Sequence, residues 1–285
     1  MEERNIYQDI SERTNGDIYI GVVGPVRTGK STFIKKFMDT IVIPNMDENS
    51  RRDRAIDEMP QSAAGRTIMT TEPKFIPEQA VTVNIDDSAT FRVRMIDCVG
   101  YIVPSALGYI ENDLPRMIRT PWYDEPIPFN MAAEIGTQKV ITEHSTIGLL
   151  ITTDGSISEI PREEYEEAEE RVVSELKEIK KPFIILLNCT NPTAPQSQAL
   201  AENMQKRYKV PVQPVNCLEL NEKEIRDVLA KILFEFPVKE IKVEMPHWLS
   251  TLEKKHWLRS AIFQIIQQSA SKISRIRASG VGQEK

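Results

Sequence analysis

The sequence predicts a three-layer, doubly wound α/β domain followed by a strand-helix extension. The first observation is a glycine-rich turn at residues 24–31, which stands between a β-branched run and a helical pattern. The second is the regular alternation of apolar runs and amphipathic helices between residues 146 and 236. Because β-α-β crossovers are right-handed, such an alternation builds a mostly parallel sheet with helices on both faces.

The composition is that of an ordinary globular protein of 285 residues, with 40% hydrophobic and 27% charged residues. The net charge of −6 gives no electrostatic reason to expect a nucleic acid partner. Three widely spaced cysteines argue against a zinc site or a disulfide framework. Residues 1–5 lack the apolar core of a signal peptide, and no apolar run reaches the ~18–20 residues of a membrane span. We therefore expect a cytoplasmic protein whose membrane contact is only peripheral.

Residues 24–31, Gly-Pro-Val-Arg-Thr-Gly-Lys-Ser, fit the P-loop pattern G-x-x-x-x-G-K-[ST] without a mismatch. The run 18–23 predicts a buried strand before the loop, and residues 32–38 predict a helix after it. A helix N-terminus behind such a turn binds phosphate, so we assign Lys30 to the β- and γ-phosphates and Ser31 to Mg²⁺. The alternative, a chance glycine turn, is disfavoured by both flanks. The predicted phosphate-binding residues are Gly24, Arg27, Thr28, Gly29, Lys30, Ser31 and Thr32.

The first helix is expected to end near Thr40, because the β-branched residues and proline of 41–44 follow it. Residues 45–79 are charge-dense and then small and polar, which predicts an exposed loop with a short helix. In P-loop GTPases a threonine of this loop reaches Mg²⁺ and the γ-phosphate when the triphosphate is bound. Thr70 or Thr71 fits that place, and a threonine at a strand edge is the alternative.

A hairpin of alternating strands is predicted at residues 80–85 and 91–96, and its second strand ends in Asp97-Cys98-Val99-Gly100. This matches the D-x-x-G of GTPases, whose aspartate holds Mg²⁺ and whose glycine N–H meets the γ-phosphate. An aspartate that caps a turn is the alternative. The order of the motifs predicts a GTPase-like, TRAFAC-type P-loop NTPase. Tyr101 stands where GTPases carry a catalytic glutamine, so hydrolysis is expected to be slow.

Residues 101–145 form an insertion rich in proline and aromatic residues. We expect a helix at 131–144 in which Ile135, Val140 and Ile141 form the buried stripe. The insertion either relays the nucleotide state to a partner surface or serves as a lid that only packs, and the sequence favours neither. His144 is expected at a helix end or in the core rather than as a ligand.

The second half alternates regularly until Pro237. The predicted strands are 146–152, 183–188 and 210–215, the last at an edge, and the predicted helices are 163–180, 199–208 and 222–236. The charge run of the first of these helices is interpreted as a solvated face. After Pro237 we expect a strand at 238–245 and one long helix from Trp248 to about Ile276. The domain prediction is 1–237 for the nucleotide domain and 238–285 for the start of a second, helical region.

The base-recognition motif of GTPases, N-K-x-D, is altered here. The strand ends in Asn188-Cys189-Thr190-Asn191, so cysteine replaces the lysine and Asn191 replaces the aspartate. A neutral amide cannot accept both guanine donors as a carboxylate does. The usual S-A-K is also replaced, by the Asn-Cys-Leu of residues 216–218. ATP is therefore the expected nucleotide, with Asn188 still near the base.

These departures, with the runs Pro-Gln-Ser-Ala-Ala-Gly (60–65) and Met-Thr-Thr-Glu-Pro-Lys-Phe (69–75), closely resemble the stage IV sporulation protein A family of endospore-forming bacteria. The resemblance extends to about residue 260. It implies a cytoskeletal ATPase that binds ATP and Mg²⁺ and assembles into a static platform around the forespore, on which the spore coat is built. It also implies recruitment to the outer forespore membrane, in the mother cell, by a small amphipathic peptide, and recruitment of further coat proteins.

The same resemblance assigns roles to residues. Lys30 matches the Walker A lysine, Asp97 the Walker B aspartate, and Thr70 with Thr71 the sensor threonines. The expected catalytic residues are thus Lys30, Thr70, Thr71 and Asp97, and the expected metal ligands are Ser31, Thr71 and Asp97; Gly100 and Asn188 complete the nucleotide site. Two other classes compete with an assembly ATPase: a GTPase-like switch that binds a partner with little hydrolysis, and a structural coat protein with a vestigial site. The intact motifs argue against the vestigial site.

Overall fold

The computed structural model describes residues 17–45, 53, 55–57, 59, 73–86, 89–111, 114–237, 241, 243–253 and 255–271. The chain divides into two compact units, Met1–Ile232 and Leu233–Lys285, and each is described by itself. Thr70 and Thr71, on which the sensor prediction falls, lie outside the described residues.

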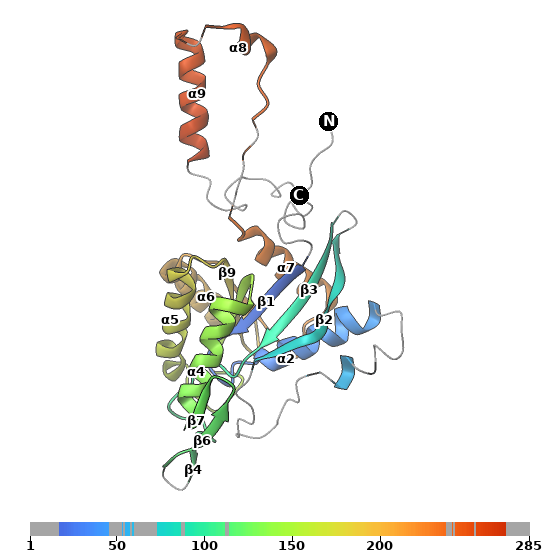
Figure 1. Cartoon of the computed structure of the whole chain (residues 1–285), viewed down its shortest axis with the longest axis vertical. Helices are drawn as coiled ribbons and strands as arrows, with labels where there is room; N and C mark the ends of the chain where they lie inside the picture. Colours follow the sequence, from blue (N-terminus) through green and yellow to red (C-terminus); the bar gives the residue numbers. More distant parts are fainter. Residues whose placement is uncertain are drawn as a thin grey trace. The chain divides into compact units, whose positions relative to one another are not determined.

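A mostly parallel sheet forms the centre of the first unit (Figure 1). Among the described residues it has six strands in the order β10-β9-β8-β1-β3-β2, and only β2 runs antiparallel, against β3. The strands are β1 (Asp17–Val23), β2 (Lys74–Asp86), β3 (Ala89–Asp97), β8 (Ile147–Thr153), β9 (Phe183–Asn188) and β10 (Val212–Val215). The mixed α/β class is confirmed, as are the predicted hairpin and the edge position of the last strand.

Helices cover both faces of this sheet. Every residue of β8 and β9 is buried, and because side chains alternate between the two faces of a strand, neither face is open to solvent there. The helices of the first unit include α2 (Lys30–Phe37), α5 (Glu163–Glu178) and α6 (Pro195–Tyr208), and α7 (Glu222–Phe234) spans the boundary of the two units. Three acidic residues in the first turn of α5 and Lys177 in its last turn match the helix dipole.

The predicted end of the first helix near Thr40 is wrong. The chain stays helical after α2, through a π-helical turn at Met38–Val42 and a 3₁₀ turn at Ile43–Asn45. Met38, Ile41 and Val42 are fully buried, so packing against the core outweighs the low helix propensity of their β-branched neighbours. Pro44, which has no backbone N–H to donate, lies in the 3₁₀ turn at the end of the helical segment.

The insertion after β3 folds into two small hairpins and a helix. Its elements are β4 (Ile110–Glu111), β5 (Leu114–Pro115), β6 (Met117–Thr120), β7 (Tyr123–Pro128), α4 (Phe129–Lys139) and a π-helical turn, Val140–His144. Val140 and Ile141 are buried as predicted, but Ile135 is only partly buried. The small residues Ala132, Ala133 and Gly136 are buried on α4 instead. The His144 ring lies edge-on to Phe75 with 5.7 Å between centroids, which is a packing role.

The second unit departs from the prediction in two ways. The described residues of the predicted strand, 241 and 243–245, are not in a strand. The predicted long helix is broken into α8 (His247–Thr251) and α9 (Trp257–Ala270), and residues 272–276 lie outside the described part. The break has a local cause, because His256 has extended backbone angles and its Nδ1 accepts the Leu258 N–H at 3.3 Å, capping α9.

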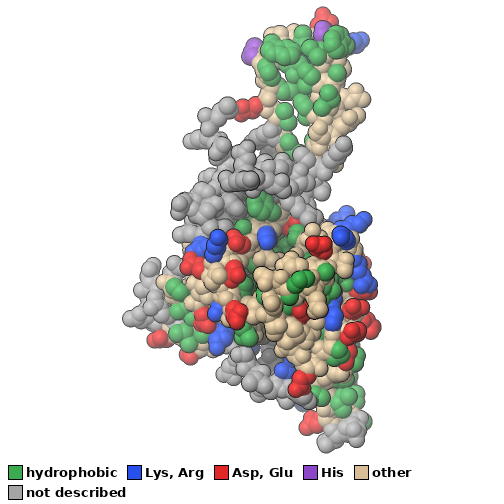
Figure 2. Space-filling model, turned by 180° about the vertical axis from the view of Figure 1, so that it is seen from behind, with side chains coloured by type: hydrophobic (Ala, Val, Ile, Leu, Met, Phe, Trp, Pro, Cys, Tyr) green, Lys and Arg blue, Asp and Glu red, His purple; other side chains and the backbone are tan. Residues whose placement is uncertain are grey.

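Apolar side chains lie on the surface of α8 and α9, as Figure 2 shows in green. Trp257 is 72% exposed and Ile265 62%. Within the described ranges, no helix combines the length and the apolar character that crossing a bilayer requires.

Candidate functional site

The P-loop occupies the point at which the order of the sheet reverses. The chain passes from β1 to β3 on one side of it and then to β8 on the other side. The loop leaves the carboxyl end of β1 and enters α2 at Lys30, so its N–H groups and the helix dipole meet at one place. Open α/β sheets bind ligands at such reversal points.

Glycine is required where the loop meets its neighbours. Gly29 has φ +94°, and a Cβ there would lie 2.2 Å from Asn188 Nδ2. Gly100 has φ +92°, and a Cβ there would lie 2.0 Å from the Gly24 carbonyl oxygen and 2.6 Å from Lys30 Nζ. Both positions combine a left-handed backbone with a neighbour that lies too close to admit a side chain. Glycine therefore allows the close approach of these segments.

Lys30 is enclosed by the loop that precedes it. Its side chain is buried, and Nζ donates to the carbonyl oxygens of Pro25 at 2.5 Å and Gly24 at 3.3 Å. Burial lowers the pKa of Lys30, and the acidic groups of Cys98 and Asp97 oppose that shift. A buried ammonium group whose partners among the described residues are carbonyl oxygens is electrostatically suited to receive phosphate oxygens.

Asp97 and Ser31 meet across the site although 66 residues separate them. Ser31 Oγ donates to Asp97 Oδ2 at 2.9 Å, whereas Asp97 Oδ1 is buried without a hydrogen-bond partner among the described residues. Burial raises the pKa of Asp97, and the Lys30 charge opposes that shift. A hydroxyl and a carboxylate oxygen without a partner, side by side, are the oxygen ligands that Mg²⁺ prefers.

The segment after Asp97 is hydrogen-bonded to the P-loop. The Tyr101 N–H donates to the Gly24 carbonyl at 3.3 Å, and the Val26 N–H donates to the Tyr101 carbonyl at 2.9 Å. The structure therefore brings Gly24, Lys30 and Gly100 together, with Ser31 and Asp97 beside them.

Asn188, at the end of β9, holds two loops together. Its Nδ2 donates to the Thr28 carbonyl at 3.0 Å, and its Oδ1 accepts the Cys217 N–H at 3.0 Å. The side chain is 4% exposed. The expectation that this amide lies near the base is therefore refined, because both of its polar atoms bind backbone groups and its direct role is to join the P-loop to the loop after β10.

We expect Asn188→Ala to destabilise the fold by about 1–3 kcal/mol, because a buried N–H and a buried C=O lose their partners. Asn188→Asp is the sharper variant: it keeps the acceptor for Cys217 but sets a carboxylate oxygen against the Thr28 carbonyl. We expect it to be at least as destabilising as alanine in urea unfolding. Equal stability of Asn188→Asp and the unmodified chain would contradict this role.

Asn191, which replaces the guanine-binding aspartate of GTPases, is bound to its own loop. Its Oδ1 accepts the Thr193 N–H at 3.2 Å and the Thr193 hydroxyl at 2.8 Å. In the loop after β10, Asn216 Nδ2 donates to the Thr190 carbonyl at 3.3 Å, and its Oδ1 accepts the Leu218 N–H at 3.1 Å. These loops carry neutral amides engaged in local bonds.

The remaining predicted residues lie in the loop and the first turn of α2. Thr28 is buried, and its hydroxyl donates to the Pro25 carbonyl at 3.0 Å. Arg27 has φ +64°, and its Nη2 is buried without a hydrogen-bond partner among the described residues. Thr32 is partly buried on α2.

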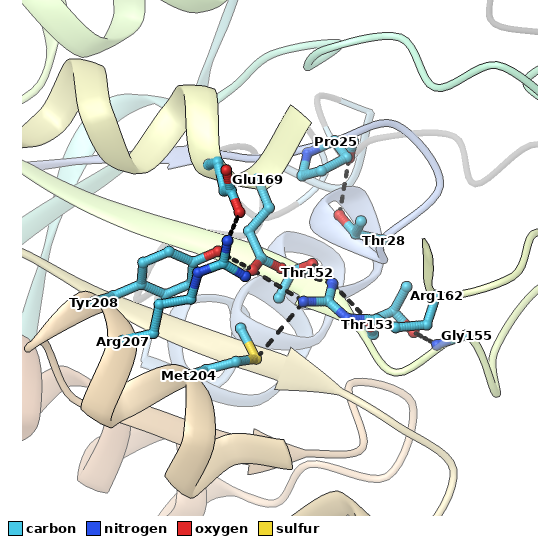
Figure 3. A network of polar contacts seen from close by, with 11 residues as sticks. Pro25, Thr28, Thr152, Thr153, Gly155, Arg162, Glu169, Met204, Arg207 and Tyr208 are labelled. Carbon is cyan, nitrogen blue, oxygen red and sulfur yellow. Dashed lines mark hydrogen bonds and ion pairs between the residues drawn. The ribbon is translucent and has the colours of Figure 1, made fainter. Parts of the chain in front are cut away.

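Figure 3 shows a buried ion pair at the turn after β8 that the sequence analysis did not predict. The guanidinium of Arg162 binds both oxygens of Glu169, at 2.7 and 3.0 Å, and also the Thr152 hydroxyl and the Thr153 carbonyl. The Tyr208 hydroxyl donates to Glu169 at 2.8 Å. Glu169 is completely buried, so the interpretation of the α5 charge run as a solvated face is wrong at this residue.

Comparison with known proteins adds independent information. Residues 1–237 match the family model of stage IV sporulation protein A, ATPase domain, and residues 238–283 match that of stage IV sporulation protein A, middle domain. Relatives named stage IV sporulation protein A are 56% identical in Bacillus anthracis, 53% in Bacillus subtilis (strain 168) and 51% in Clostridioides difficile (strain 630). The alignments cover 97%, 97% and 96% of this chain and 56% of each relative, so the chain spans about 56% of their length.

Proposed function

Because this chain belongs to the stage IV sporulation protein A family, we propose that it is an Mg²⁺-dependent ATP hydrolase of the GTPase-like P-loop class. The resemblance inferred from the sequence is confirmed, and the family carries an ATPase domain. We further propose that hydrolysis drives self-assembly into a static platform on the forespore surface for coat assembly. Residues 1–237 would form the ATPase domain and residues 238–285 the start of a second region.

The observation that carries the proposal is the meeting of Lys30, Ser31 and Asp97 at one end of the sheet. Asp97 Oδ1 is buried without a hydrogen-bond partner among the described residues, and a buried carboxylate oxygen of this kind fits a divalent cation. Ser31 and Asp97 would hold Mg²⁺, with Thr71 as a further candidate. No group of three or more His, Cys, Asp or Glu side chains suited to a metal occurs among the described residues. The remaining ligands would then be phosphate oxygens and water.

The chain's own groups divide the work. Lys30 and the N–H groups of the glycine loop would bind the phosphate oxygens, and the Gly100 N–H is the proposed donor to the γ-phosphate. Mg²⁺, when bound, neutralises the charge that develops on the phosphate oxygens. The Tyr101 hydroxyl is bound to Glu175, so it does not orient the attacking water. Turnover is therefore slow. ATP is favoured over GTP because Asn191 cannot accept two guanine donors.

We expect Asp97→Ala to abolish ATP turnover. The test is phosphate release from ATP and from GTP with Mg²⁺, followed over protein concentration. Asp39→Ala removes an exposed carboxylate just after α2 and should leave the rate unchanged. Turnover that is selective for ATP, rises with concentration and vanishes in Asp97→Ala would support an assembly ATPase. Equal or faster turnover of GTP would sink the proposed nucleotide preference.

A GTPase-like switch that binds a partner is the second candidate, and one observation favours it. Large apolar side chains are exposed on the hairpins of the insertion, with Ile110 53%, Leu114 68% and Met117 54% exposed. Such residues suit contact with another protein, and by family the partners would be a small amphipathic membrane-anchoring peptide and coat proteins. The placement at the outer forespore membrane, in the mother cell, belongs to the same proposal. Tighter binding of GTP than of ATP with little hydrolysis would favour the switch.

A further inference from the structure

Tyr101 follows the D-x-x-G motif, and its side chain is hydrogen-bonded to α5. It is 2% exposed, and its hydroxyl donates to Glu175, whose two carboxylate oxygens lie at 2.5 and 2.6 Å. A hydroxyl that binds a carboxylate in a buried site makes a strong, charge-assisted bond. Burial raises the pKa of Tyr101, and the bond to Glu175 raises it further. The phenol therefore stays protonated and keeps donating.

Arg171 and Glu134 lie around this pair and hold it in place. The Arg171 guanidinium lies 4.6 Å from the centroid of the Tyr101 ring. Arg171 also binds Glu134 of α4 at 2.8 Å and Glu175 at 3.6 Å. Three elements, α4, α5 and the segment after β3, thus converge on one aromatic ring. The ring cannot leave without breaking several contacts at once.

The backbone of Tyr101 is at the same time part of the phosphate site. Its N–H and carbonyl bond to Gly24 and Val26 on the P-loop, and these three peptides form a parallel bridge between the two segments. Gly100, the residue before, lies so close that a Cβ would touch the Gly24 carbonyl and Lys30 Nζ. A bond made at the phenol therefore bears directly on the geometry around Lys30.

We propose that Tyr101 is a positioning residue whose hydroxyl bond to Glu175 fixes the Gly100–Tyr101 segment on the P-loop before nucleotide binds. In this protein the segment is then a static wall of the phosphate site rather than a switch that moves with the nucleotide. The inference rests on the ATP hydrolysis proposed above, because its kinetic consequence is a rate of turnover.

Tyr208 offers a matched control, because its carboxylate acceptor lies on the same helix, α5, as that of Tyr101. Tyr208 also donates its hydroxyl to a carboxylate of α5, Glu169, and Arg207 lies 5.5 Å from its ring centroid. The two tyrosines share a buried phenol, an acidic partner and a neighbouring guanidinium. Only Tyr101 is bonded to the P-loop. A difference between Tyr101→Phe and Tyr208→Phe would therefore arise from where the lost hydrogen bond lies and not from the kind of bond that is lost.

The kinetic experiment compares these variants in ATP turnover. We expect Tyr101→Phe to lower kcat about tenfold, as loss of one positioning bond would, with KM within about threefold because the binding groups remain. Tyr208→Phe should stay within about twofold of the unmodified kcat. Glu175→Gln retains an acceptor and should preserve most of the rate, and Glu175→Ala should match Tyr101→Phe. Adding Tyr101→Phe to Glu175→Ala should lower kcat no further.

A second measurement does not depend on turnover. Amide hydrogen exchange without nucleotide should show slow exchange at the N–H groups of Val26 and Tyr101, and Tyr101→Phe should accelerate it about tenfold or more with β8 unchanged. If the unmodified chain does not hydrolyse ATP, the proposed function fails and the exchange result still decides the positioning role. Unchanged exchange at these amides in Tyr101→Phe, or an equal fall of kcat in Tyr208→Phe, would overturn the inference.

Discussion

Replacing Lys30 with alanine is expected to weaken ATP binding by about 100-fold or more, which corresponds to about 2.7 kcal/mol. Lys30 is the cation that the glycine loop encloses, and its partners in the structure are the carbonyl oxygens of Gly24 and Pro25. Phosphate oxygens brought into this site without the ammonium would face those carbonyl dipoles unpaired. A charge-assisted bond in a buried site is lost, and an unfavourable field takes its place.

The measurement is equilibrium titration of Mg²⁺-ATP by calorimetry. Lys35→Ala, on an exposed position of the same helix, is the matched control and should bind as the unmodified chain does. Lys30→Arg keeps the charge, but its larger planar group does not fit between the two carbonyls, so a marked loss is expected there too. Binding by Lys30→Ala within threefold of the unmodified chain would remove Lys30 from the phosphate site.

Much of this site could be predicted because its parts are local sequence motifs. The order of these motifs along the chain determines which strand ends lie next to each other in the sheet. The run before Gly24 had to be a buried strand, and residues 91–96 had to be another. Parallel neighbours place their carboxyl ends at one edge, and in the structure Val22 is in register with Asp97. The contact between Ser31 and Asp97 follows from that register. Thr70 and Thr71 remain predictions, because they lie outside the described residues.

The parts that sequence reasoning missed depend on tertiary contacts. From the sequence, Tyr101 was interpreted only as a residue that cannot replace the catalytic glutamine. Its partner Glu175 could not be predicted, because it lies 74 residues away on a helix whose charge run was interpreted as a solvated face. The two backbone partners of the Asn188 side chain could not be predicted either, because motif analogy names the residue but not the direction of its amide. The break before α9 escaped notice because a histidine cap has no strong propensity signal.

Glu169 is different, because a signal existed. The buried residues of α5 include Tyr165, Ala168, Val172, Val173 and Leu176, and Glu169 falls on this stripe at the i, i+3 and i, i+4 spacing of one helix face. A carboxylate on an apolar stripe is buried and must have a partner. Applying the helical period to the acidic residues as well as the apolar ones would have predicted it.

Glu169→Ala is expected to destabilise the fold by about 3–5 kcal/mol, the usual consequence of removing one partner of a buried ion pair. Arg162 would keep a charge in the interior with Thr152 and Thr153 as its oxygen partners in the described part of the chain, and the Tyr208 hydroxyl would lose its acceptor.

The matched control is the next residue. Glu170 pairs with Arg207, but both side chains are about half exposed, so Glu170→Ala should change the unfolding free energy by about 0–1 kcal/mol. The measurement is urea unfolding of the whole chain. Joint replacement, Arg162→Met with Glu169→Leu, removes the charge together with its partner and should recover most of the stability lost in Glu169→Ala. If Glu169→Ala and Glu170→Ala unfold at the same urea concentration, the Arg162–Glu169 pair does not hold the turn after β8.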